Sequence, residues 1–382
     1  MPQPIKQARV TFSVTNCICF DQRVMKMAET VKGLGCEVLI IGRTRGECCR
    51  NGMVPFPVKR FRMLFNRKFL FYATFNLKLF FFLLFVKTDI LVADDLDTLL
   101  PNFLVSKLRR LPLVYDSHEY FTGVPELNGR PFIKSVWKLI EKSIFPYLNN
   151  IITVSDSLAD QYEKEYGVRP LVVKNCSKRS QHLKGHSRKE MGINEKDFLL
   201  IIQGSGINAD KGGEELIEAV RITENVSLLI VGSGDILEDL EKMVTTMDLG
   251  RRVRFVPKLK WEELMRYTKS VDAGMCLEKG TNLNYRFSIP NKLCDYISAG
   301  IPVVAGNLPE IKKIVEGYRC GIIIPDITSL NISQAVIELR DNGNLRNELK
   351  RNSSAASEEL NWENESLKVA SFYRALLPYD VQ

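Results

Sequence analysis

The sequence predicts an α/β fold with two doubly wound parallel sheets, and three observations support this prediction. Short β-branched apolar runs alternate with helical patterns from one end of the chain to the other, which is typical of βαβ units. The 382 residues are enough for two or three domains of about 150 residues each. A polar, basic stretch at 175–190 lacks apolar periodicity, divides the apolar runs into two series and is expected to be a linker.

Each series consists of apolar runs of strand length. The strands expected in the first series are 10–14, 37–42, 89–94, 111–116 and 150–155. Those expected in the second series are 198–204, 226–232, 253–257, 273–277, 301–306 and 321–326. We therefore expect an N-terminal Rossmann-like domain over 1–178, a C-terminal one over 190–360, and a last helix in 361–382 that packs back on the first domain. Ligands of open α/β sheets bind beyond the carboxyl ends of the strands, so the side chains that follow each strand are the candidate site residues.

The composition argues against several classes of protein. With 45% hydrophobic and 26% charged residues, neither a disordered chain nor a polytopic membrane protein fits. Nine cysteines without paired C-x-x-C spacing, together with three histidines, offer little material for a zinc site and indicate reduced thiols in a cytoplasm. The N-terminus shows no apolar run typical of a signal peptide before the first expected strand.

The net charge of +8 is concentrated in one part of the chain. Between residues 48 and 88 there are eight bases and no acid, and residues 60–87 hold nine of the 20 phenylalanines. Lys78 interrupts this apolar run and argues against a membrane span. Two interpretations remain: a core helix followed by a basic surface turn, or an interfacial helix pair in which residues 59–87 bind an anionic membrane surface. Nucleic-acid binding is disfavoured, because the aromatic side chains are too numerous to be exposed stacking platforms.

The segment 288–311, SIPNKLCDYISAGIPVVAGNLPEI, predicts a helix that starts at an anion site. Pro290 suits the first turn of a helix, and Gly300 suits its end. The first-turn amides, with Ser288 beside them, form a site for an anion. Asp295 lies about one turn further on, where its carboxylate could accept hydrogen bonds from a sugar diol. The alternative is a helix that merely packs, with a solvated aspartate.

These residues resemble the donor-binding signature of the family 4 glycosyltransferases of the bacterial surface-polysaccharide type, which are retaining enzymes with the GT-B fold. Residues 204–220 resemble the family's glycine turn, basic residue and helix, and residues 228–259 resemble the strand, Gly-x-Gly, helix and strand that follow. The resemblance spans essentially the whole chain. It implies two Rossmann-like domains facing a central cleft, the first binding the acceptor and the second the nucleotide-sugar, with no cofactor and no obligatory metal.

The resemblance also implies roles for individual residues of the second domain. Asp295 would hold the ribose and Lys211 the diphosphate, and both are catalytic candidates. The other donor-binding candidates are Gly204, Ser205, Ser288, Pro290 and Asn291. Two polar residues of the family pattern are missing, because its first glutamate falls at Phe287 and its usual arginine at Ser205. Four upstream residues could replace the glutamate or be ordinary loop residues: Glu278, Asn282, Asn284 and Tyr285.

The candidate residues of the first domain follow the strands expected at 89–94 and 111–116. His118 is either a structural residue or, as the resemblance implies, an active-site histidine that hydrogen-bonds the transferred sugar. Asp95 and Asp97 could orient an acceptor or cap the helix expected from Thr98. Their spacing also imitates the metal motif of the unrelated GT-A glycosyltransferases, but the donor elements in the second half argue against that interpretation. The remaining acceptor or cleft candidates are Glu119 and Asp21, and Asp21 could instead be a helix cap.

Together these features predict a hexosyl- or N-acetylhexosaminyl-type glycosyltransferase of polysaccharide biosynthesis. It would move a sugar, with retention, from a nucleotide-sugar to a lipid-linked or nascent glycan acceptor. It is expected in the cytoplasm, peripheral at the inner face of the cytoplasmic membrane, without a nucleic-acid partner. Two alternatives remain: a nucleotide-sugar epimerase of the same fold, which needs no acceptor, and a non-catalytic paralogue that binds nucleotide-sugar or glycan.

Overall fold

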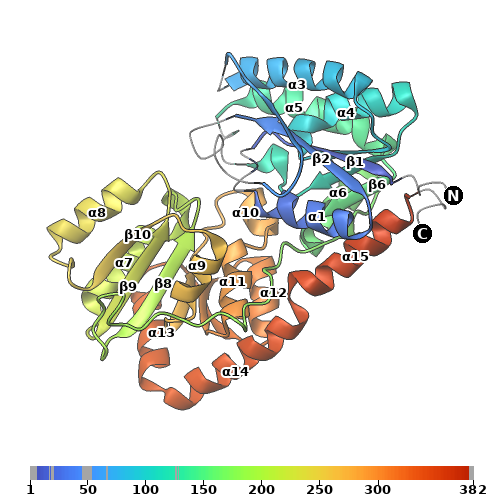
Figure 1. The fold of residues 1–382 in the computed structure, drawn as a ribbon. Helices are drawn as coiled ribbons and strands as arrows, with labels where there is room; N and C mark the ends of the chain where they lie inside the picture. The colour runs from blue at the N-terminus through green and yellow to red at the C-terminus, as the bar shows by residue number, and fades with distance from the viewer. Residues whose placement is uncertain are drawn as a thin grey trace. The chain divides into compact units, whose positions relative to one another are not determined.

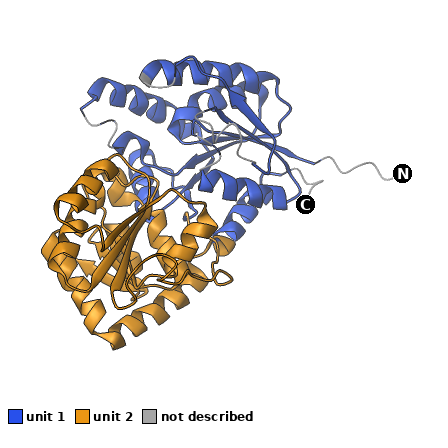
Figure 2. Ribbon diagram, turned by 60° about the vertical axis from the view of Figure 1, so that its left-hand side comes forward, with its two compact units in different colours: residues 1–174, 365–382 blue, residues 175–364 orange. Residues whose placement is uncertain are grey.

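The computed structural model divides the chain into two compact units (Figure 2). Unit 1 consists of Met1–Lys174 and Glu365–Gln382, and unit 2 consists of Asn175–Asn364. The structure describes residues 7–377 except 17, 19–20, 45–53, 66–67, 125–126 and 128. Arg50 and Arg67 of the basic segment therefore lie outside the described residues.

Unit 1 is built on a parallel sheet, three strands of which, β1, β2 and β6, are labelled in Figure 1. The strand order of this sheet is β3-β2-β1-β4-β5-β6-β7. Its strands are β1 Arg9–Ser13, β2 Glu37–Arg43, β3 Val58–Phe61, β4 Ile90–Asp94, β5 Leu113–Ser117, β6 Asn150–Thr153 and β7 Leu171–Val172. Its helices are α1 Gln22–Gly33, α3 Lys68–Phe85, α4 Leu96–Arg109, α5 Pro131–Ile144 and α6 Asp156–Tyr166. The chain order reverses at β1, which pairs with both β2 and β4, so the carboxyl ends of β1 and β4 lie beside a topological switch point.

Unit 2 has a second parallel sheet, with the order β10-β9-β8-β11-β12-β13. Its strands are β8 Phe198–Gly204, β9 Val226–Gly232, β10 Val253–Pro257, β11 Ala273–Cys276, β12 Val303–Gly306 and β13 Gly321–Ile324. Its helices are α7 Gly213–Ile222, α8 Leu237–Thr246, α9 Trp261–Thr268, α10 Leu283–Phe287, α11 Asn291–Ala299, α12 Pro309–Gly317, α13 Ser329–Asp341 and α14 Gly343–Glu359.

Both faces of the unit 2 sheet are covered by apolar side chains. Leu200 and Ile202 belong to one hydrophobic core, whereas Leu199 and Ile201 of the same strand belong to another. Because successive side chains of a strand point to opposite faces, the two cores lie on opposite sides of the sheet. The prediction of two doubly wound α/β sheets is therefore confirmed, and every expected run contains a strand. The short edge strands β3 and β7 were not expected.

One segment, 175–190, differs from the sequence-based description, in which it is a linker. Residues 175–190 belong to unit 2, where Cys176 and Ser180 are fully buried and Ser180 Oγ donates to the carbonyl oxygen of Ser298 at 2.7 Å. This stretch packs against the rest of unit 2 through polar contacts. Its lack of apolar periodicity therefore did not indicate a linker. The last helix, α15 Trp362–Arg374, carries the fully buried Tyr373. Burial and the charges of Asp116 and Asp94 raise the pKa of this tyrosine, so it lies near the carboxylates of unit 1.

The phenylalanine-rich segment forms one helix, α3, with two different faces. Phe71, Phe75, Leu79 and Leu83, spaced four residues apart, are buried. The other face leaves Phe69 and Phe85 exposed, with 65% and 82% of their surface accessible. Among the helices that the structure describes, none is long and apolar enough to cross a membrane.

Candidate functional site

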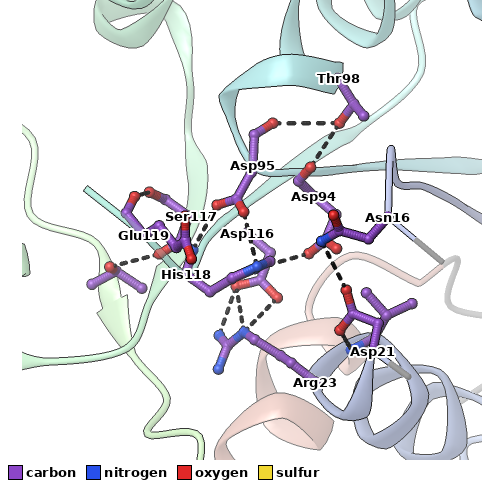
Figure 3. Close-up of polar contacts among 12 residues, drawn as sticks. Asn16, Asp21, Arg23, Asp94, Asp95, Thr98, Asp116, Ser117, His118 and Glu119 are labelled. Atoms are coloured by element: carbon purple, nitrogen blue, oxygen red, sulfur yellow. Dashed lines mark hydrogen bonds and ion pairs between the residues drawn. The ribbon is translucent and has the colours of Figure 1, made fainter. Parts of the chain in front are cut away.

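A cluster of charged side chains lies at the carboxyl ends of β4 and β5 (Figure 3). His118 follows β5, and its Nε2 lies 2.8 Å from Asp95 Oδ2 while its Nδ1 lies 3.3 Å from Asp94 Oδ1. The backbone N–H of His118 donates to the other oxygen of Asp95 at 3.1 Å. Burial opposes the charged imidazole, but Asp95 and Asp94 outweigh it and raise the pKa of His118 well above its usual value.

Asp95 has a strained backbone. It precedes α4 with φ 60° and ψ 170°, a region that is essentially restricted to glycine. Its side chain makes no helix-capping hydrogen bond and is directed to His118 instead. Capping therefore does not explain this residue. Strain of this kind persists where the surrounding structure imposes it, and it is common at functional sites.

Asp97 lies in the first turn of α4, which starts at Leu96 and not at Thr98 as expected. Its carboxyl group is buried and accepts a hydrogen bond from Thr15 Oγ1. Burial, reinforced by the charge of Asp95, raises the pKa of Asp97 to about 7. A carboxyl group with this pKa can exchange a proton at neutral pH, as a general acid or base must.

Two further residues after β1 contribute to the cluster. Asp21 caps α1, because its side chain accepts from the backbone N–H of Val24 at 3.1 Å. Arg23, on the same helix, is buried and binds both oxygens of Asp116 with contacts of 2.6 to 3.1 Å. This buried ion pair was not expected from the sequence, since the two residues lie 93 positions apart.

Among the described residues, Asp21, Asp94 and His118 could hold a metal ion, because their ligand atoms lie within 4.8 Å of one another. In this structure the His118 ring is instead placed between two carboxylates. The expectation that no metal is obligatory stays a prediction.

A cavity of about 840 Å³ opens beside this cluster, with a volume in the range of small-molecule sites. Its polar lining includes Asp94, Asp95, Asp97, His118 and Glu119. Its apolar lining comes mainly from α3, α5 and the short 3-10 helix Phe121–Gly123. Besides Phe132, α5 contributes a stripe at 133, 136, 137 and 140, a helical spacing that from sequence alone indicates an ordinary core face.

In unit 2, Glu278 lies between two lysines. Lys292 Nζ is 3.0 Å and Lys211 Nζ is 3.6 Å from Glu278 Oε1, and Cys276 Sγ donates to the other carboxylate oxygen. Although burial alone would raise it, the two ammonium groups lower the pKa of Glu278 to about 2. Burial lowers the pKa of Lys211, whose Nζ also lies 3.8 Å from the ring centre of Tyr285. Glu278 is therefore an ionised partner of Lys211 and not an ordinary loop residue.

Asp295 occupies a different environment from the open position expected of it. Its carboxylate is buried and accepts hydrogen bonds from Ser177 Oγ at 2.5 Å, Gln203 Nε2 at 2.9 Å and Trp261 Nε1 at 3.1 Å. These donors come from three separate segments, so Asp295 ties α11 to its neighbours.

The remaining donor-binding candidates lie at two places in unit 2. Pro290 is the N-cap of α11, and Asn291, the first helical residue, accepts from Asn175 Nδ2 at 2.9 Å. Gly204 ends β8 and Ser205 follows it, beside the loop that follows β9, since the N–H of Ser233 donates to the carbonyl oxygen of Gly204 at 3.0 Å. A Cβ at Gly232 would lie 1.8 Å from that oxygen, so this approach requires glycine.

Ser288 ends α10, and its N–H donates to the carbonyl oxygen of Asn284 at 3.0 Å. Asn282 caps the same helix by accepting from the N–H of Tyr285 at 2.9 Å. The structural interpretation of Asn282 therefore applies. Among the four upstream candidates, Glu278 is the carboxylate that pairs with Lys211, and its role in place of the missing glutamate stays a prediction.

The strain at Asp95 predicts a stability difference between two variants. Asp95→Gly and Asp95→Ala both remove the carboxylate, but only glycine tolerates this backbone conformation. We expect Asp95→Gly to be more stable than Asp95→Ala by about 1–3 kcal/mol in urea unfolding. Equal stabilities would show that the backbone at this position is not strained.

The raised pKa of Asp97 predicts a pH-dependent stability. The unfolded carboxyl ionises near pH 4, whereas the folded one keeps its proton until about pH 7. The free energy of unfolding should therefore fall as the pH rises from 4 to 7, by about 4 kcal/mol at 1.36 kcal/mol per pH unit. Asp97→Asn mimics the protonated carboxyl group, so its free energy of unfolding should not show this fall between pH 4 and 7. Parallel stability profiles of the two proteins between pH 4 and 8 would contradict the assignment.

Comparison with known proteins agrees with this architecture. The curated relatives include chitobiosyldiphosphodolichol beta-mannosyltransferase of Candida albicans, 25% identical over 239 residues, which cover 56% of this chain and 51% of the relative. They also include the GDP-mannose-dependent alpha-(1-6)-phosphatidylinositol monomannoside mannosyltransferase of Mycobacterium tuberculosis, 25% identical over 158 residues, or 40% of each chain. The chain thus aligns with about half or less of the length of these relatives. HepE of Anabaena, solved with UDP and glucose, has a TM-score of 0.77 and 16% identity, covering 97% of this chain and 100% of that one.

Two family models match the two halves of the chain. The model described as Glycosyltransferase Family 4 matches residues 22–176, and the model described as Glycosyl transferases group 1 matches residues 184–355. Together with the two parallel α/β sheets, these matches show that the chain belongs to the family 4 glycosyltransferases of the GT-B fold.

Proposed function

We propose that this protein transfers a hexosyl or N-acetylhexosaminyl group from a nucleotide-sugar to a hydroxyl acceptor, with retention of configuration. The observation that carries the proposal is the cluster of His118, Asp95 and Asp97 on the cavity at the carboxyl ends of β4 and β5. Two of the curated relatives are named mannosyltransferases, which supports a hexose as the transferred group.

The donor half of the proposal rests on unit 2. Breaking the anomeric bond develops positive charge on the sugar and negative charge on the departing diphosphate, so cations and amide dipoles near the phosphates favour reaction. Lys211 supplies a cation, and α11 supplies an N-terminal dipole near Pro290 and Asn291. Glu278 positions Lys211, and binding of a diphosphate would give this partly desolvated ammonium a second anionic partner.

The part of the proposal that concerns the transferred sugar and the acceptor hydroxyl rests on unit 1. Both ring nitrogens of His118 face carboxylates, and the contact to Asp94 is the longer of the two. We expect a hydroxyl of the transferred sugar to replace that contact while Asp95 keeps the ring oriented. Asp97, with its pKa near neutrality, is placed to exchange a proton with an acceptor hydroxyl.

Replacing His118 tests the function directly. A panel of UDP- and GDP-sugars identifies the donor by thermal shift, since a ligand at one hundred times its Kd stabilises by about 2.7 kcal/mol. With that donor, His118→Ala should lower the turnover of sugar transfer by about ten- to a hundredfold, because the variant loses one charge-assisted hydrogen bond to the transition state. The Kd of the donor should change much less. His186→Ala, which removes an imidazole paired with Glu263 in unit 2, is the control and should keep its turnover.

Product analysis separates the alternatives. A transferred sugar in α or β configuration establishes transfer and its stereochemistry, and a converted nucleotide-sugar without acceptor identifies an epimerase. Donor binding without any product identifies a non-catalytic binding protein. An unchanged turnover in His118→Ala would remove the imidazole from the reaction.

We also propose that unit 1 docks on an anionic membrane, at the cytoplasmic face, through α3 and its neighbours α4 and α5. The three helices lie side by side in unit 1 (Figure 1). They carry exposed large apolar side chains, which are Phe69, Leu70, Leu77, Phe81 and Phe85 on α3, Leu100, Leu104 and Leu108 on α4, and Phe132 and Leu139 on α5. Exposed bases accompany them at Lys59, Arg62, Lys78 and Lys87. Apolar side chains at the acyl boundary and bases at the headgroups are the pattern of an interfacial surface.

Charge removal tests this docking. Changing Lys59, Arg62, Lys78 and Lys87 to Gln should lower binding to anionic vesicles by orders of magnitude at low salt, since each base near the surface contributes ~1 kcal/mol. Higher ionic strength should have the same effect on the wild type. The control changes four exposed unit 2 bases to Gln: Lys242, Arg251, Lys312 and Arg351. Equal loss of co-sedimentation in both variants would show a general charge effect and no docking surface.

A further inference from the structure

We infer that the unit 1 cavity binds the apolar chain of an amphiphilic acceptor, with the hydroxyl-bearing head of that acceptor at Asp95 and Asp97, beside His118. The inference rests on the proposed transferase function and names the class of acceptor that the same site takes. The pocket lies within unit 1, and it shares Phe69, Leu100 and Phe132 with the proposed docking surface of the outer helices.

The first support is an apolar wall with defined geometry. Trp137 of α5 packs edge-on against Tyr72 of α3, with ring centres 5.4 Å apart, and against Phe121 at 5.2 Å. All three rings line the cavity. Edge-to-face packing fixes their orientation, so the wall is a preformed apolar surface and not a set of loose side chains.

The second support is that α5 leaves its apolar stripe half-buried. Ile133, Val136, Trp137 and Ile140 all line the cavity and are only partly covered, whereas the described buried residues of α5 are Glu141 and Ile144. A helix stripe of this spacing is normally covered by the core of its own domain. Here it faces a space of ligand size, so a ligand with an apolar part would complete its burial.

The third support is that the wall and the polar cluster are held together. Asn76 of α3 donates from Nδ2 to the carbonyl oxygen of Asp97 at 2.9 Å and to that of Tyr72 at 2.8 Å. This side chain joins the apolar wall to the first turn of α4, where Asp97 lies. One ligand can therefore contact both, its chain on the wall and its hydroxyls at the carboxylates.

The cavity rim extends the apolar surface outward. Phe69 and Phe132 line the cavity and are 65% and 80% exposed. A purely polar glycan would leave these rings and the wall behind them in water. An acceptor with an apolar chain would cover them, so the lining favours a lipid-linked acceptor over a free glycan.

The experiment is a chain-length series of alkyl β-glucosides, hexyl, heptyl and octyl, each below its critical micelle concentration. Binding is read from the fluorescence of Trp137, and the signal is assigned to it by its loss in Trp137→Phe. Each added methylene should raise the affinity about fourfold, which corresponds to ~0.8 kcal/mol for each buried CH₂. Free glucose should bind far more weakly than octyl glucoside.

A matched pair of α3 variants locates the binding. Ala73 lines the cavity, and Ala73→Phe should fill it, weaken octyl glucoside binding at least tenfold and abolish the chain-length dependence. Leu77 is exposed on the same helix and outside the cavity lining, and Leu77→Phe keeps the apolar character of the proposed docking surface. This variant should therefore bind octyl glucoside as the wild type does. Circular dichroism and melting curves check that both variants fold.

Several outcomes would overturn the inference. The first is an affinity for the glucosides that does not depend on chain length. The second is a chain-length dependence in Ala73→Phe as large as that of the wild type. The third is a loss of octyl glucoside affinity in Leu77→Phe equal to that in Ala73→Phe. Failure of the proposed function gives a different result, since glucoside binding would follow the expected series while no nucleotide-sugar is bound or consumed. Donor binding and transfer to a water-soluble acceptor without any chain-length dependence would leave the function standing and refute the apolar pocket.

Discussion

Neutralisation of buried carboxylates is the constraint on which the unit 1 site depends. Asp94, Asp95, Asp97 and Asp116 are all buried near the carboxyl ends of β4 and β5, where isolated charges would be very costly. Arg23 and the His118 imidazole supply the compensating groups, and Asp97 is protonated over much of the acidic range. Because these groups compensate one another, removal of one leaves its partner buried and unpaired, which is strongly destabilising. The network thus holds polar chemistry in place at the edge of an apolar cavity.

In unit 2 the buried groups that need a counter-charge are cations and not carboxylates. There, two buried or half-buried ammonium groups share one fully ionised carboxylate, Glu278, and Lys211 is desolvated enough for its pKa to fall. Such a group gains more from an incoming anion than a solvated lysine does, because the attraction acts in a medium of lower dielectric constant. Position 287 holds Phe where the family pattern has its first glutamate, and the carboxylate that pairs with both lysines, Glu278, comes from the loop after β11.

The helices around the unit 1 cavity combine several roles. One face of α3 packs in the core through Phe75 and Leu79, another contributes Tyr72 to the cavity wall, and a third leaves Phe81 and Phe85 exposed. The core-helix interpretation of the phenylalanine-rich segment therefore applies to one face of α3, and membrane binding stays a proposal. In the described part of residues 59–87 there is one helix, α3, and no second helix beside it. A helix with apolar residues on nearly every side is usually buried throughout. Its incomplete burial here is what connects the proposed membrane surface with the proposed pocket.

The sequence by itself determined the described strands except the edge strands β3 and β7, because each of the others is a β-branched apolar run of strand length bounded by polar turns. It also placed Asp95 and His118 after adjacent strands, so their proximity followed from the parallel sheet. Only the tertiary structure decided that Asp295 is enclosed by three donors, that Glu278 holds Lys211, and that the stripe of α5 lines a cavity. These features depend on contacts between segments up to 118 residues apart, and on how completely each helix face is covered, which local pattern and propensity do not encode.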